Sequence, residues 1–374
     1  MNQNSVSTLP VVGILGDGQL AMMMAEAYQK LGGLAYILAS DQSAPASQVA
    51  DKVFIGRIED ADSVADFFSA VDVVTLENEF NDAQLMIDLA DAHSTPIYPE
   101  PAKFSLIEDK LSEKRFFESL GVPMAKYLEI SDESQLPDTP GYLKLAKGGY
   151  DGIGTYRVEG RSESVALFNE IKQAGTVLFE HAIDFKQELS LIGVSDKEQI
   201  VFYPLVGTEQ AQGTCMYVTY PCELAQDIQQ QAQDYVTRIL DKLDTKGLFA
   251  FEFFLTKDEQ LLINESAPRP HNSGHITMNL ANCSQFENHM RAVAGLDLVE
   301  PEMLTESMTM LNLLATKDSD FDNDEVIARI TDDECSATLY RKNKSRVKRK
   351  MGHINIWGED QRQRAEQLIE QLDI

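Results

Sequence analysis

The chain has 374 residues and a formal net charge of −28 at pH 7, so we expect two or three domains whose surface repels DNA, RNA and anionic membranes. A helical membrane protein is excluded, since no run approaches the roughly 20 apolar residues of a membrane-spanning helix. The polar N-terminus lacks a signal-peptide pattern and the four cysteines lack metal-like spacing, so we expect a cytoplasmic protein with reduced thiols.

The first hundred residues alternate short apolar runs with helical segments. The expected strands cover 11–16, 34–39, 49–56 and 71–77, and the first expected helix covers 19–32. This alternation indicates the α/β class with a parallel, doubly wound sheet. We place this domain at residues 1–100.

Two polar patterns follow strands of this sheet. GDGQLA, residues 16–21, joins a strand to a helix, where glycines let backbone N–H groups approach an anion. A dinucleotide-binding fingerprint would need glycine in place of Ala21. Glu77 and Glu79 follow the fourth strand, and their alternation lets at most one face a ligand. For both patterns, a ligand contact and a ligand-free turn or strand end stay open.

The middle of the chain is rich in expected antiparallel strands, which is typical of an α+β arrangement. After a helical segment at 100–120, expected strands cover 141–146, 175–180, 187–194, 199–207 and 216–221, a helix covers 223–243, and a hairpin pair covers 247–256 and 259–266. We place this domain at residues 101–300. A small third domain, at 301–374, combines short strands with a last helix.

A glycine-rich loop, KGGYDGIG at 147–154, joins two of the expected strands. Such a loop can close over nucleotide phosphates with backbone donors, and Lys144 on the preceding strand supplies a fixed positive charge. The pattern favours phosphate binding over a simple hairpin turn. Glu180 and Glu188, further along, are placed to contact an adenosine, although taken alone they are better interpreted as solvated glutamates.

Two glutamates lie within apolar strands. FEFF and INES place Glu252 and Glu265 on neighbouring strands, with Asn264 beside them. Glutamate is almost never fully buried unless it is paired or binds a metal. Hard oxygen ligands of this kind predict a Mg²⁺ site that carries nucleotide phosphates. Two half-exposed edge glutamates are the weaker interpretation.

The segment APRPHNSGH, residues 267–275, follows directly. Its two prolines stiffen the backbone around Arg269, whose guanidinium fork can hold a carboxylate, a phosphate or a carbonate-like anion. Directional hydrogen-bonding groups come next, from His271, Asn272 and Ser273. A basic cluster, RKNKSRVKRKMGH at 341–353, runs against the acidic background and indicates a phosphate-bearing small substrate rather than nucleic acid.

Taken together, these motifs resemble the ATP-grasp enzymes and, among them, the N5-carboxyaminoimidazole ribonucleotide synthetase family of purine biosynthesis. The matching motifs are GDGQL, ENE, GGYDGIG, FEHAIDFKQELS, FEFF, NESAPRPHNSGH, SQFENHMRA and RKMGH. They occur in the order of the family and span almost the whole chain. APRPHNSGH is specific to this family within the superfamily.

The resemblance implies a pre-ATP-grasp domain, an ATP-grasp domain and a small C-terminal domain, assembled as a homodimer. It implies that ATP, with Mg²⁺ or Mn²⁺, phosphorylates bicarbonate to carboxyphosphate. This intermediate, or CO₂ released from it, then carboxylates the exocyclic amine of 5-aminoimidazole ribonucleotide. No nucleic-acid or membrane partner is implied.

The resemblance also implies roles for individual residues. The implied ATP contacts are Lys110, Lys144, Gly149, Tyr150, Asp151, Gly152, Ile153, Gly154, Thr155, Glu180, His181, Ala182, Ile183, Glu188, Gln210, Asn264 and Glu265. The implied metal ligands are Glu252 and Glu265. The implied catalytic residues at the bicarbonate and amine are Arg269, His271, Asn272, Ser273, Tyr150 and Asp151. The implied ribonucleotide contacts are Gln19, Leu20, Glu77, Lys342, Arg349 and Lys350.

The chain departs from the family at three places, one of which is Leu145-Ala146-Lys147 before the glycine-rich loop, where more basic residues are common. The family usually has GQLGRM where this chain has GQLAMM, so Ala21 and Met22 replace a glycine and an arginine. Gln210 stands where a histidine is common. Two other hypotheses therefore stay open: a different ATP-grasp ligase, including a formate-using transformylase, and a non-catalytic nucleotide-binding protein.

Overall fold

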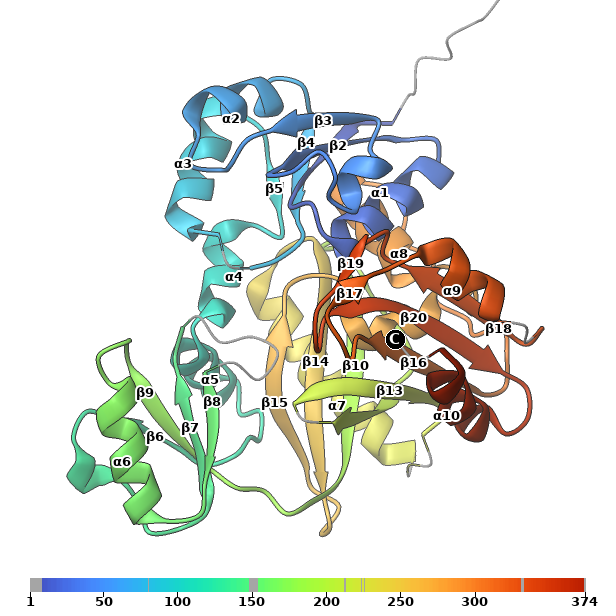
Figure 1. Ribbon diagram of the computed structural model, residues 1–374. Coiled ribbons are helices and arrows are strands. Elements are labelled where there is room, and N and C mark those ends of the chain that lie inside the picture. The colour runs from blue at the N-terminus through green and yellow to red at the C-terminus, as the bar shows by residue number, and fades with distance from the viewer. Residues whose placement is uncertain are drawn as a thin grey trace, which may run out of the picture.

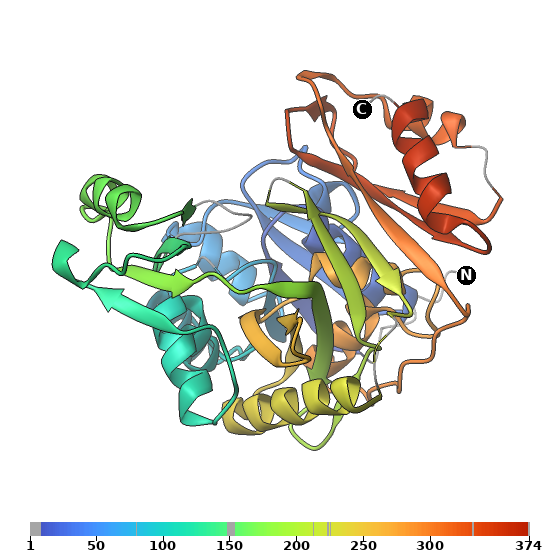
Figure 2. The same cartoon turned by 90° about the horizontal axis from the view of Figure 1, so that it is seen from below.

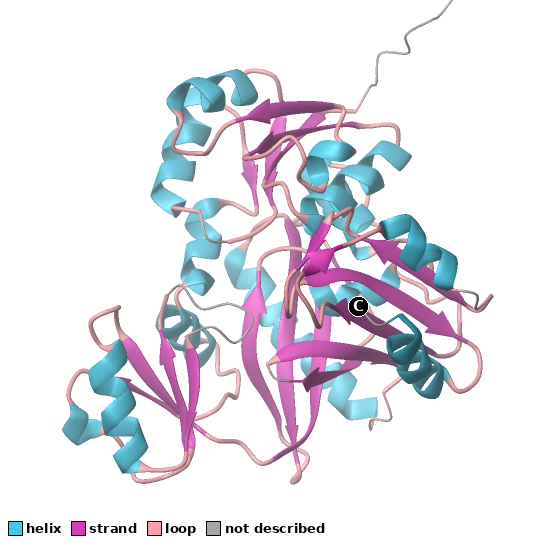
Figure 3. Ribbon diagram, in the orientation of Figure 1, coloured by secondary structure: helices cyan, strands magenta, loops and turns pink. Residues whose placement is uncertain are grey.

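The computed structural model describes residues 9–79, 81–147, 154–211, 213–222, 224, 226–330 and 333–372. Figure 1 shows a parallel sheet with its helices at the top, a small sheet at the lower left, and a long sheet that runs through the middle into the C-terminal segment. Figure 3 shows helices beside each of these sheets. The predicted mixture of an α/β region and antiparallel regions is confirmed.

The N-terminal region is a five-stranded sheet in the order β3-β2-β1-β4-β5, and its four strand pairs are parallel. Its elements are β1 (Val11–Leu15), α1 (Gln19–Lys30), β2 (Leu34–Ala39), η1 (Ala46–Gln48), β3 (Lys52–Ile55), α2 (Ala61–Phe68), β4 (Val73–Leu76), α3 (Ala83–His93) and β5 (Ile97–Tyr98). The strand order reverses between β1 and β4, as in a doubly wound sheet. The third strand begins at Lys52 rather than at residue 49, because the backbone N–H groups of Val49 and Ala50 still donate to the carbonyl of Ala46 in the turn that follows η1.

Two helices connect this sheet to the centre, where the sequence predicted one helical segment. α4 (Pro101–Glu108) and α5 (Lys110–Ser119) are separated at Asp109. The Asp109 carboxylate accepts hydrogen bonds from the backbone N–H groups of Leu111 and Ser112. This is N-capping, which starts a new helix by satisfying its first donors.

A small antiparallel sheet follows, in the order β6-β9-β7-β8. Its elements are β6 (Tyr127–Ile130), η2 (Glu133–Gln135), β7 (Gly141–Leu145), β8 (Thr155–Val158), α6 (Arg161–Ile171) and β9 (Val177–His181). One face packs on α6 in a small core of its own, which includes Leu143, Phe168 and Phe179.

The long sheet has the order β15-β14-β10-β12-β13-β16-β20-β18, and β11 pairs separately with β10. Its central elements are β10 (Phe185–Ser195), β11 (Ile200–Phe202), β12 (Val206–Ala211), β13 (Thr214–Tyr220), α7 (Gln226–Leu243), β14 (Gly247–Thr256), β15 (Leu261–Ala267), η3 (Asn272–Thr277) and α8 (Gln285–Ala294). The single strand predicted at 199–207 was wrong. The structure has two strands there, because Pro204 lacks the N–H that a continuous ladder requires.

The C-terminal strands extend this same sheet, since β16 pairs with β13. The C-terminal elements are β16 (Met308–Leu314), β17 (Ser319–Asp320), α9 (Asn323–Arg329), β18 (Cys335–Leu339), β19 (Lys344–Ser345), β20 (Lys350–Trp357) and α10 (Gln361–Leu372). Figure 2 shows this segment projecting from the rest of the molecule. The boundary expected at residue 301 therefore lies between two parts of one continuous sheet.

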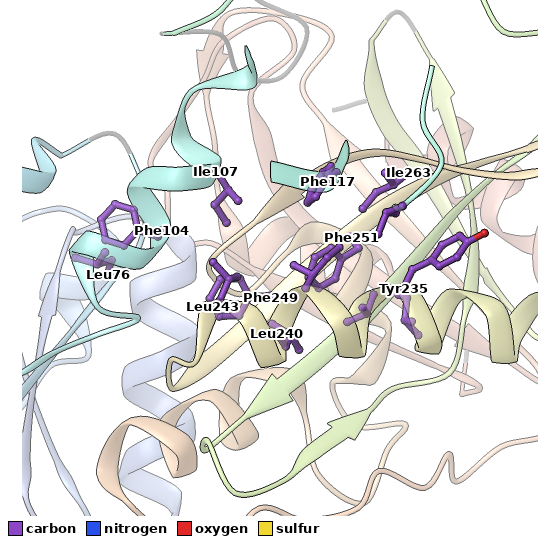
Figure 4. Packing of buried hydrophobic residues seen from close by; sticks show 14 of the residues in the cluster. Leu76, Phe104, Ile107, Phe117, Tyr235, Leu240, Leu243, Phe249, Phe251 and Ile263 are labelled. Carbon is purple, nitrogen blue, oxygen red and sulfur yellow. The ribbon is translucent and has the colours of Figure 1, made fainter. Parts of the chain in front are cut away.

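Shared hydrophobic packing joins the N-terminal region to the centre. Figure 4 shows Leu76 of β4 in the same buried cluster as Phe104 of α4 and Phe249 of β14. In a second cluster, Met290 of α8 packs with residues of α1. These contacts hold the carboxyl ends of the N-terminal strands against the middle of the chain. Within the described residues, no helix combines the length and apolar character needed to cross a bilayer.

Candidate active site

Glu252 and Glu265 face each other on neighbouring strands. Glu252 of β14 is the register partner of Glu265 of β15, and the register shifts directly after this pair. The shift makes Asn264 the extra residue of a β-bulge, a device that re-aims side chains next to active sites. The Asn264 amide nitrogen lies 3.5 Å from Glu252 Oε2. The three residues predicted from FEFF and INES therefore do lie together.

The two carboxylates have different surroundings. Lys110 Nζ lies 3.2 Å from Glu265 Oε2 and holds the pKa of Glu265 below its usual range. Burial, reinforced by the neighbouring Glu265, raises the pKa of Glu252. Two half-buried carboxylates thus lie together with one close lysine, which contacts Glu265, and like charges held together away from water are costly. A divalent cation would relieve this cost, so the oxygen donors fit Mg²⁺.

The protein itself supplies only part of a metal coordination sphere. Among the described residues, no group of three or more histidine, cysteine, aspartate or glutamate side chains is gathered as a metal site. Mg²⁺ typically keeps one or two carboxylates and completes its shell with water and substrate phosphates. Two glutamates beside an amide suit a metal that arrives with a nucleotide.

A second charged cluster lies at the small sheet. Glu180 of β9 is 4% exposed and pairs with Lys144 of β7 at 2.7 Å and with Lys114 of α5 at 2.8 Å. Burial alone would raise the pKa of Glu180, but the two lysines outweigh burial and lower the pKa. The sequence analysis missed Lys114. Its signal was the spacing of Lys110 and Lys114, which puts both on one face of a helix.

Helix α5 also contributes a buried carboxylate that the sequence analysis missed, Glu113. Its Oε1 accepts hydrogen bonds from the backbone N–H of Ser266 at 2.8 Å and from the Ser266 hydroxyl at 2.7 Å. Burial raises the pKa of Glu113 to about 7. Because Ser266 follows Glu265, this contact fixes the end of β15 beside the glutamate pair. No local motif marks a contact between residues 153 positions apart.

The loop after β15 carries Arg269 to the N-terminal region. Arg269 Nε and Nη2 lie 2.5 Å and 3.2 Å from the two carboxylate oxygens of Glu79, which is a bidentate geometry. Arg269 Nη1 donates to the carbonyl of Pro270. The guanidinium fork predicted to hold an oxyanion therefore does hold one, the carboxylate of Glu79. A contact between Arg269 and bicarbonate stays a prediction.

Glu77 binds the start of α1. Its carboxylate accepts hydrogen bonds from the backbone N–H groups of Gly18 at 2.7 Å, Leu20 at 3.1 Å and Ala21 at 3.4 Å. A Cβ atom at Gly16 or Gly18 would overlap this carboxylate. The glycines of GDGQL thus make room for an anion, as predicted, and in this structure the anion is part of the protein. Burial raises the pKa of Glu77.

His271 points back toward the metal pair, with Nε2 3.6 Å from Glu252 Oε1. The fully buried Gln285 of α8 holds the backbone of His271 from both sides. Gln285 Oε1 accepts from the His271 N–H at 3.0 Å, and Gln285 Nε2 donates to the His271 carbonyl at 2.7 Å. A side chain at position 274 would collide with Gln285, which accounts for Gly274 in HNSGH. Gln285 lies in SQFENHMRA, but no spacing rule pairs it with His271.

Asn272 is locked to the C-terminal part of the sheet. Its amide pairs reciprocally with that of Asn312 on β16, at 2.9 Å and 2.5 Å. Asn312 also donates to the carbonyl of Cys215 on β13 at 3.0 Å. The sequence analysis missed Asn312, which lies in an otherwise apolar strand. Asn272 therefore anchors the loop, and its predicted contact with substrate stays a prediction.

In the C-terminal segment, Lys342 interacts electrostatically with Arg349 and Lys350, and with Glu77 of the N-terminal region. The Lys342 ammonium is buried and donates to the Lys350 carbonyl at 2.7 Å. Burial, together with the charges of Arg349 and Lys350, lowers the pKa of Lys342 to about 7, and Glu77 opposes this shift. Burial of clustered cations costs free energy, and a bound anion offsets that cost. The arrangement therefore suits a phosphate group.

Family models match three parts of the chain. An ATP-grasp domain matches residues 115–286, a ribonucleotide synthetase preATP-grasp domain matches residues 9–108, and a phosphoribosylaminoimidazole carboxylase C-terminal domain matches residues 308–367. An N5-carboxyaminoimidazole ribonucleotide synthase from Synechocystis is 32% identical, with 98% of this chain and 97% of the relative covered. One from Bacillus subtilis is 33% identical, with 92% and 91% covered. The chain belongs to the N5-carboxyaminoimidazole ribonucleotide synthase family.

Solved structures of the family agree with the fold. A synthetase in complex with ADP has a TM-score of 0.87 at 29% identity, with 97% of this chain and 96% of that chain covered. A synthase from Aspergillus clavatus, in complex with ADP and 5-aminoimidazole ribonucleotide, has a TM-score of 0.86 at 29% identity, with 97% and 98% covered. The chain is an ATP-dependent ligase with the ATP-grasp fold.

The departure from the family at the start of α1 is absorbed by the core. Ala21 and Met22, which replace a glycine and an arginine of the family, are at most 1% exposed and pack in the cluster shared by α1 and α8. Ala21 keeps its backbone hydrogen bond to Glu77. The sequence change therefore alters the packing of α1 and leaves the Glu77 contact in place.

The structure brings together only some of the remaining residues that were predicted to contact ATP. Gly149, Tyr150, Asp151, Gly152 and Ile153 lie outside the described residues. Beyond that range, Gly154 has a positive φ of 75° and leads into Thr155, the register partner of Lys144. His181, Ala182 and Ile183 follow Glu180 in the segment that leaves the small sheet, and Glu188 is half-buried on β10. Gln210 is exposed and is not part of either charged cluster.

Proposed function

We propose that the chain carboxylates 5-aminoimidazole ribonucleotide to N5-carboxyaminoimidazole ribonucleotide, using ATP and bicarbonate, in de novo purine biosynthesis. The observation that carries this proposal is the Glu252–Glu265 pair with His271 directed at it from the APRPHNSGH loop. A carboxylate pair suited to a nucleotide-bound metal thus adjoins the loop that is specific to the family.

ATP is proposed to lie between the small sheet and the edge of the long sheet formed by β15 and β14. Lys110 and Lys144 are the cations nearest its phosphates, and Gly154 and Thr155 adjoin the glycine-rich loop that would cover them. Residues 180–183 and Glu188 are proposed to hold the adenosine. Glu252 and Glu265, with Asn264, would hold Mg²⁺ or Mn²⁺, which neutralises phosphate charge when bound.

The reaction divides into two transfers. A bicarbonate oxygen attacks the γ-phosphorus of ATP, which forms carboxyphosphate and releases ADP. The exocyclic amine then attacks the carboxyl carbon, directly or after CO₂ has separated, and inorganic phosphate and one proton leave. Arg269 is proposed to stabilise the carboxyl oxygens as charge develops, with His271, Asn272, Ser273, Tyr150 and Asp151 around the two reactants.

The ribonucleotide is proposed to bind between the N-terminal and C-terminal segments. Lys342, Arg349 and Lys350 supply charge for its 5′-phosphate, and this choice is supported by the cost of burying Lys342 without an anion. Gln19, Leu20 and Glu77 are proposed to contact the ribose side. We further propose that the protein is cytoplasmic and that it forms a homodimer. Light scattering of the purified protein would test the homodimer.

The decisive experiment measures phosphate release from ATP and Mg²⁺ with 5-aminoimidazole ribonucleotide and bicarbonate, each alone and both together. Label from ¹⁴C-bicarbonate in the ribonucleotide product completes it. We expect rapid release only with the ribonucleotide present, and labelled product only with both. Turnover supported by formate with another amine would favour a transformylase. ATP binding without turnover on any acceptor would favour the non-catalytic alternative.

A further inference from the structure

A series of polar contacts runs inward from the glutamate pair through His271. His271 Nε2 lies 3.6 Å from Glu252 Oε1, and His271 Nδ1 lies 2.9 Å from the Ser273 hydroxyl. The Ser273 hydroxyl in turn lies 2.7 Å from the hydroxyl of Ser190 on β10. Ser190 is the register partner of Glu252 in the β10–β14 pair. Strand β14, which carries Glu252, therefore lies beside β10, which carries Ser190, the last residue in this series of contacts.

Counting protons shows which group donates in each hydrogen bond between His271, Ser273 and Ser190. The backbone N–H of Ser273 also points at His271 Nδ1, at 3.4 Å, so Nδ1 is the acceptor. A serine hydroxyl has one proton to donate. The Ser273 hydroxyl gives its proton to Nδ1, and Ser190 gives its own to the Ser273 oxygen. The remaining ring proton then sits on Nε2, facing the Glu252 carboxylate.

Both serines are deeply buried. Ser190 is 1% exposed and Ser273 is 2% exposed. The Ser273 hydroxyl is engaged on both sides within the protein, by His271 Nδ1 and by the Ser190 hydroxyl. Groups that orient a reacting side chain from behind fix its ring and tautomer and are needed for precise placement.

We propose that Ser190 is a positioning residue that acts through Ser273, and that this pair of hydroxyls sets the tautomer and orientation of His271. Ser190 would thereby hold the His271 ring where the carboxyl group is transferred, without contacting substrate. The role in transfer rests on the proposed function. The tautomer and the hydrogen bonds are properties of the folded protein alone.

The test is ¹⁵N NMR of the full chain labelled at histidine. The chain has six histidines, and His271→Gln identifies the pair of ring signals that belongs to His271. In the wild type we expect Nδ1 at the position of an unprotonated nitrogen that accepts hydrogen bonds, and Nε2 at that of a protonated nitrogen. Ser273→Ala should move the Nδ1 signal toward that of a nitrogen without a hydrogen-bond donor. Ser190→Ala should move it the same way by less.

The conservative variant Ser190→Thr should restore the wild-type signal. It keeps the hydroxyl, and Ser190 lines a small cavity that gives the added methyl group room. Ser195→Ala is the matched control, because Ser195 is a buried serine of the same strand whose hydroxyl, within the described part of the chain, bonds to the N–H of Lys197 in its own turn. The control should leave the His271 signals unchanged.

Kinetics provide the second measurement. Ser273→Ala should lower kcat for ribonucleotide carboxylation on the order of tenfold, and Ser190→Ala by less, while the KM for ATP stays unchanged. An Nδ1 signal that does not respond to Ser273→Ala would overturn the proposal. A response to Ser273→Ala with none to Ser190→Ala would remove Ser190 from it. Changed NMR signals in a chain that shows no carboxylation would refute the proposed function instead.

Discussion

Two pairs of glutamates in this molecule differ in the donors that the protein offers to their carboxylates. Glu77 and Glu79 follow a parallel strand, and each is saturated by donors of the protein: three backbone N–H groups for one and the Arg269 fork for the other. Glu252 and Glu265 instead face each other, and Lys110 contacts the carboxylate of Glu265. Burial alone therefore does not distinguish a binding site from a structural one. What distinguishes them is whether the protein completes the shell of each carboxylate.

The largest expected effect comes from substitutions in the Glu252–Glu265 pair. Glu252→Gln and Glu265→Gln should each lower ATP turnover by about 100-fold or more, because each removes a carboxylate from the proposed metal. Folding should be maintained in Glu252→Gln, since a neutral amide also relieves the repulsion that raises the pKa of Glu252. Turnover is measured as phosphate release at saturating Mg²⁺, and folding as the urea midpoint.

Glu259→Gln is the matched control for this pair. Glu259 lies in the turn that joins β14 to β15 and is exposed. The control variant should keep wild-type turnover. Equal turnover in Glu252→Gln and in the control would mean that the pair is structural.

Glu113 adds a third case to the comparison of the glutamates. Its carboxylate accepts hydrogen bonds from Ser266, and its ionisation is still costly. Its folded-state pKa of about 7 lies above the ordinary value of 4.5. A raised pKa means that folding favours the protonated form, so its stabilising contribution is present below about pH 4.5 and is lost as the pH rises through 7. The difference corresponds to about 3 kcal/mol.

Urea unfolding of the wild type and of Glu113→Gln between pH 4.5 and 8 measures this contribution. The amide keeps an acceptor for Ser266 and does not ionise. The free energy of unfolding of the wild type should therefore fall by about 3 kcal/mol relative to the variant across this range. Parallel pH profiles for the two proteins would show that Glu113 is already satisfied when charged.

A substitution at Glu77, whose carboxylate already has three backbone donors, should affect the stability of the protein before its activity. Glu77→Gln places amide protons against the N–H groups at the start of α1 and should cost about 1–3 kcal/mol of unfolding free energy. Gly18→Ala should cost about the same, because its Cβ would overlap the Glu77 carboxylate. Both are measured by urea unfolding. Glu26→Gln is the control, since its pair with Arg341 lies at the surface and should contribute under about 1 kcal/mol. A cost for Glu77→Gln no larger than that of the control would contradict the assignment.

The sequence predicted the residues whose chemistry is marked by local pattern. Glu252 was predicted because a glutamate between two phenylalanines in a strand needs a partner, and the parallel sheet was predicted from its alternating elements. Lys114, Glu113, Gln285 and Asn312 were not predicted. Their contacts to the site join elements that are distant in the chain, so no window of sequence contains both partners. The saturation of Glu79 by Arg269 was missed for the same reason, since 190 positions separate them.

The smallest expected effect lies at Gln210, which belongs to neither kind of site. Its side chain is exposed on β12, and the resemblance to the family implies a histidine at this position. Gln210→Ala should change the free energy of unfolding by less than about 0.5 kcal/mol, as surface substitutions usually do. Gln210→His restores the histidine of the family. If the proposed nucleotide contact exists, this variant should lower the KM for ATP by about threefold, which is the contribution of one modest hydrogen bond. A KM equal to that of the wild type would place Gln210 outside the nucleotide site, and exposure alone would then account for the departure.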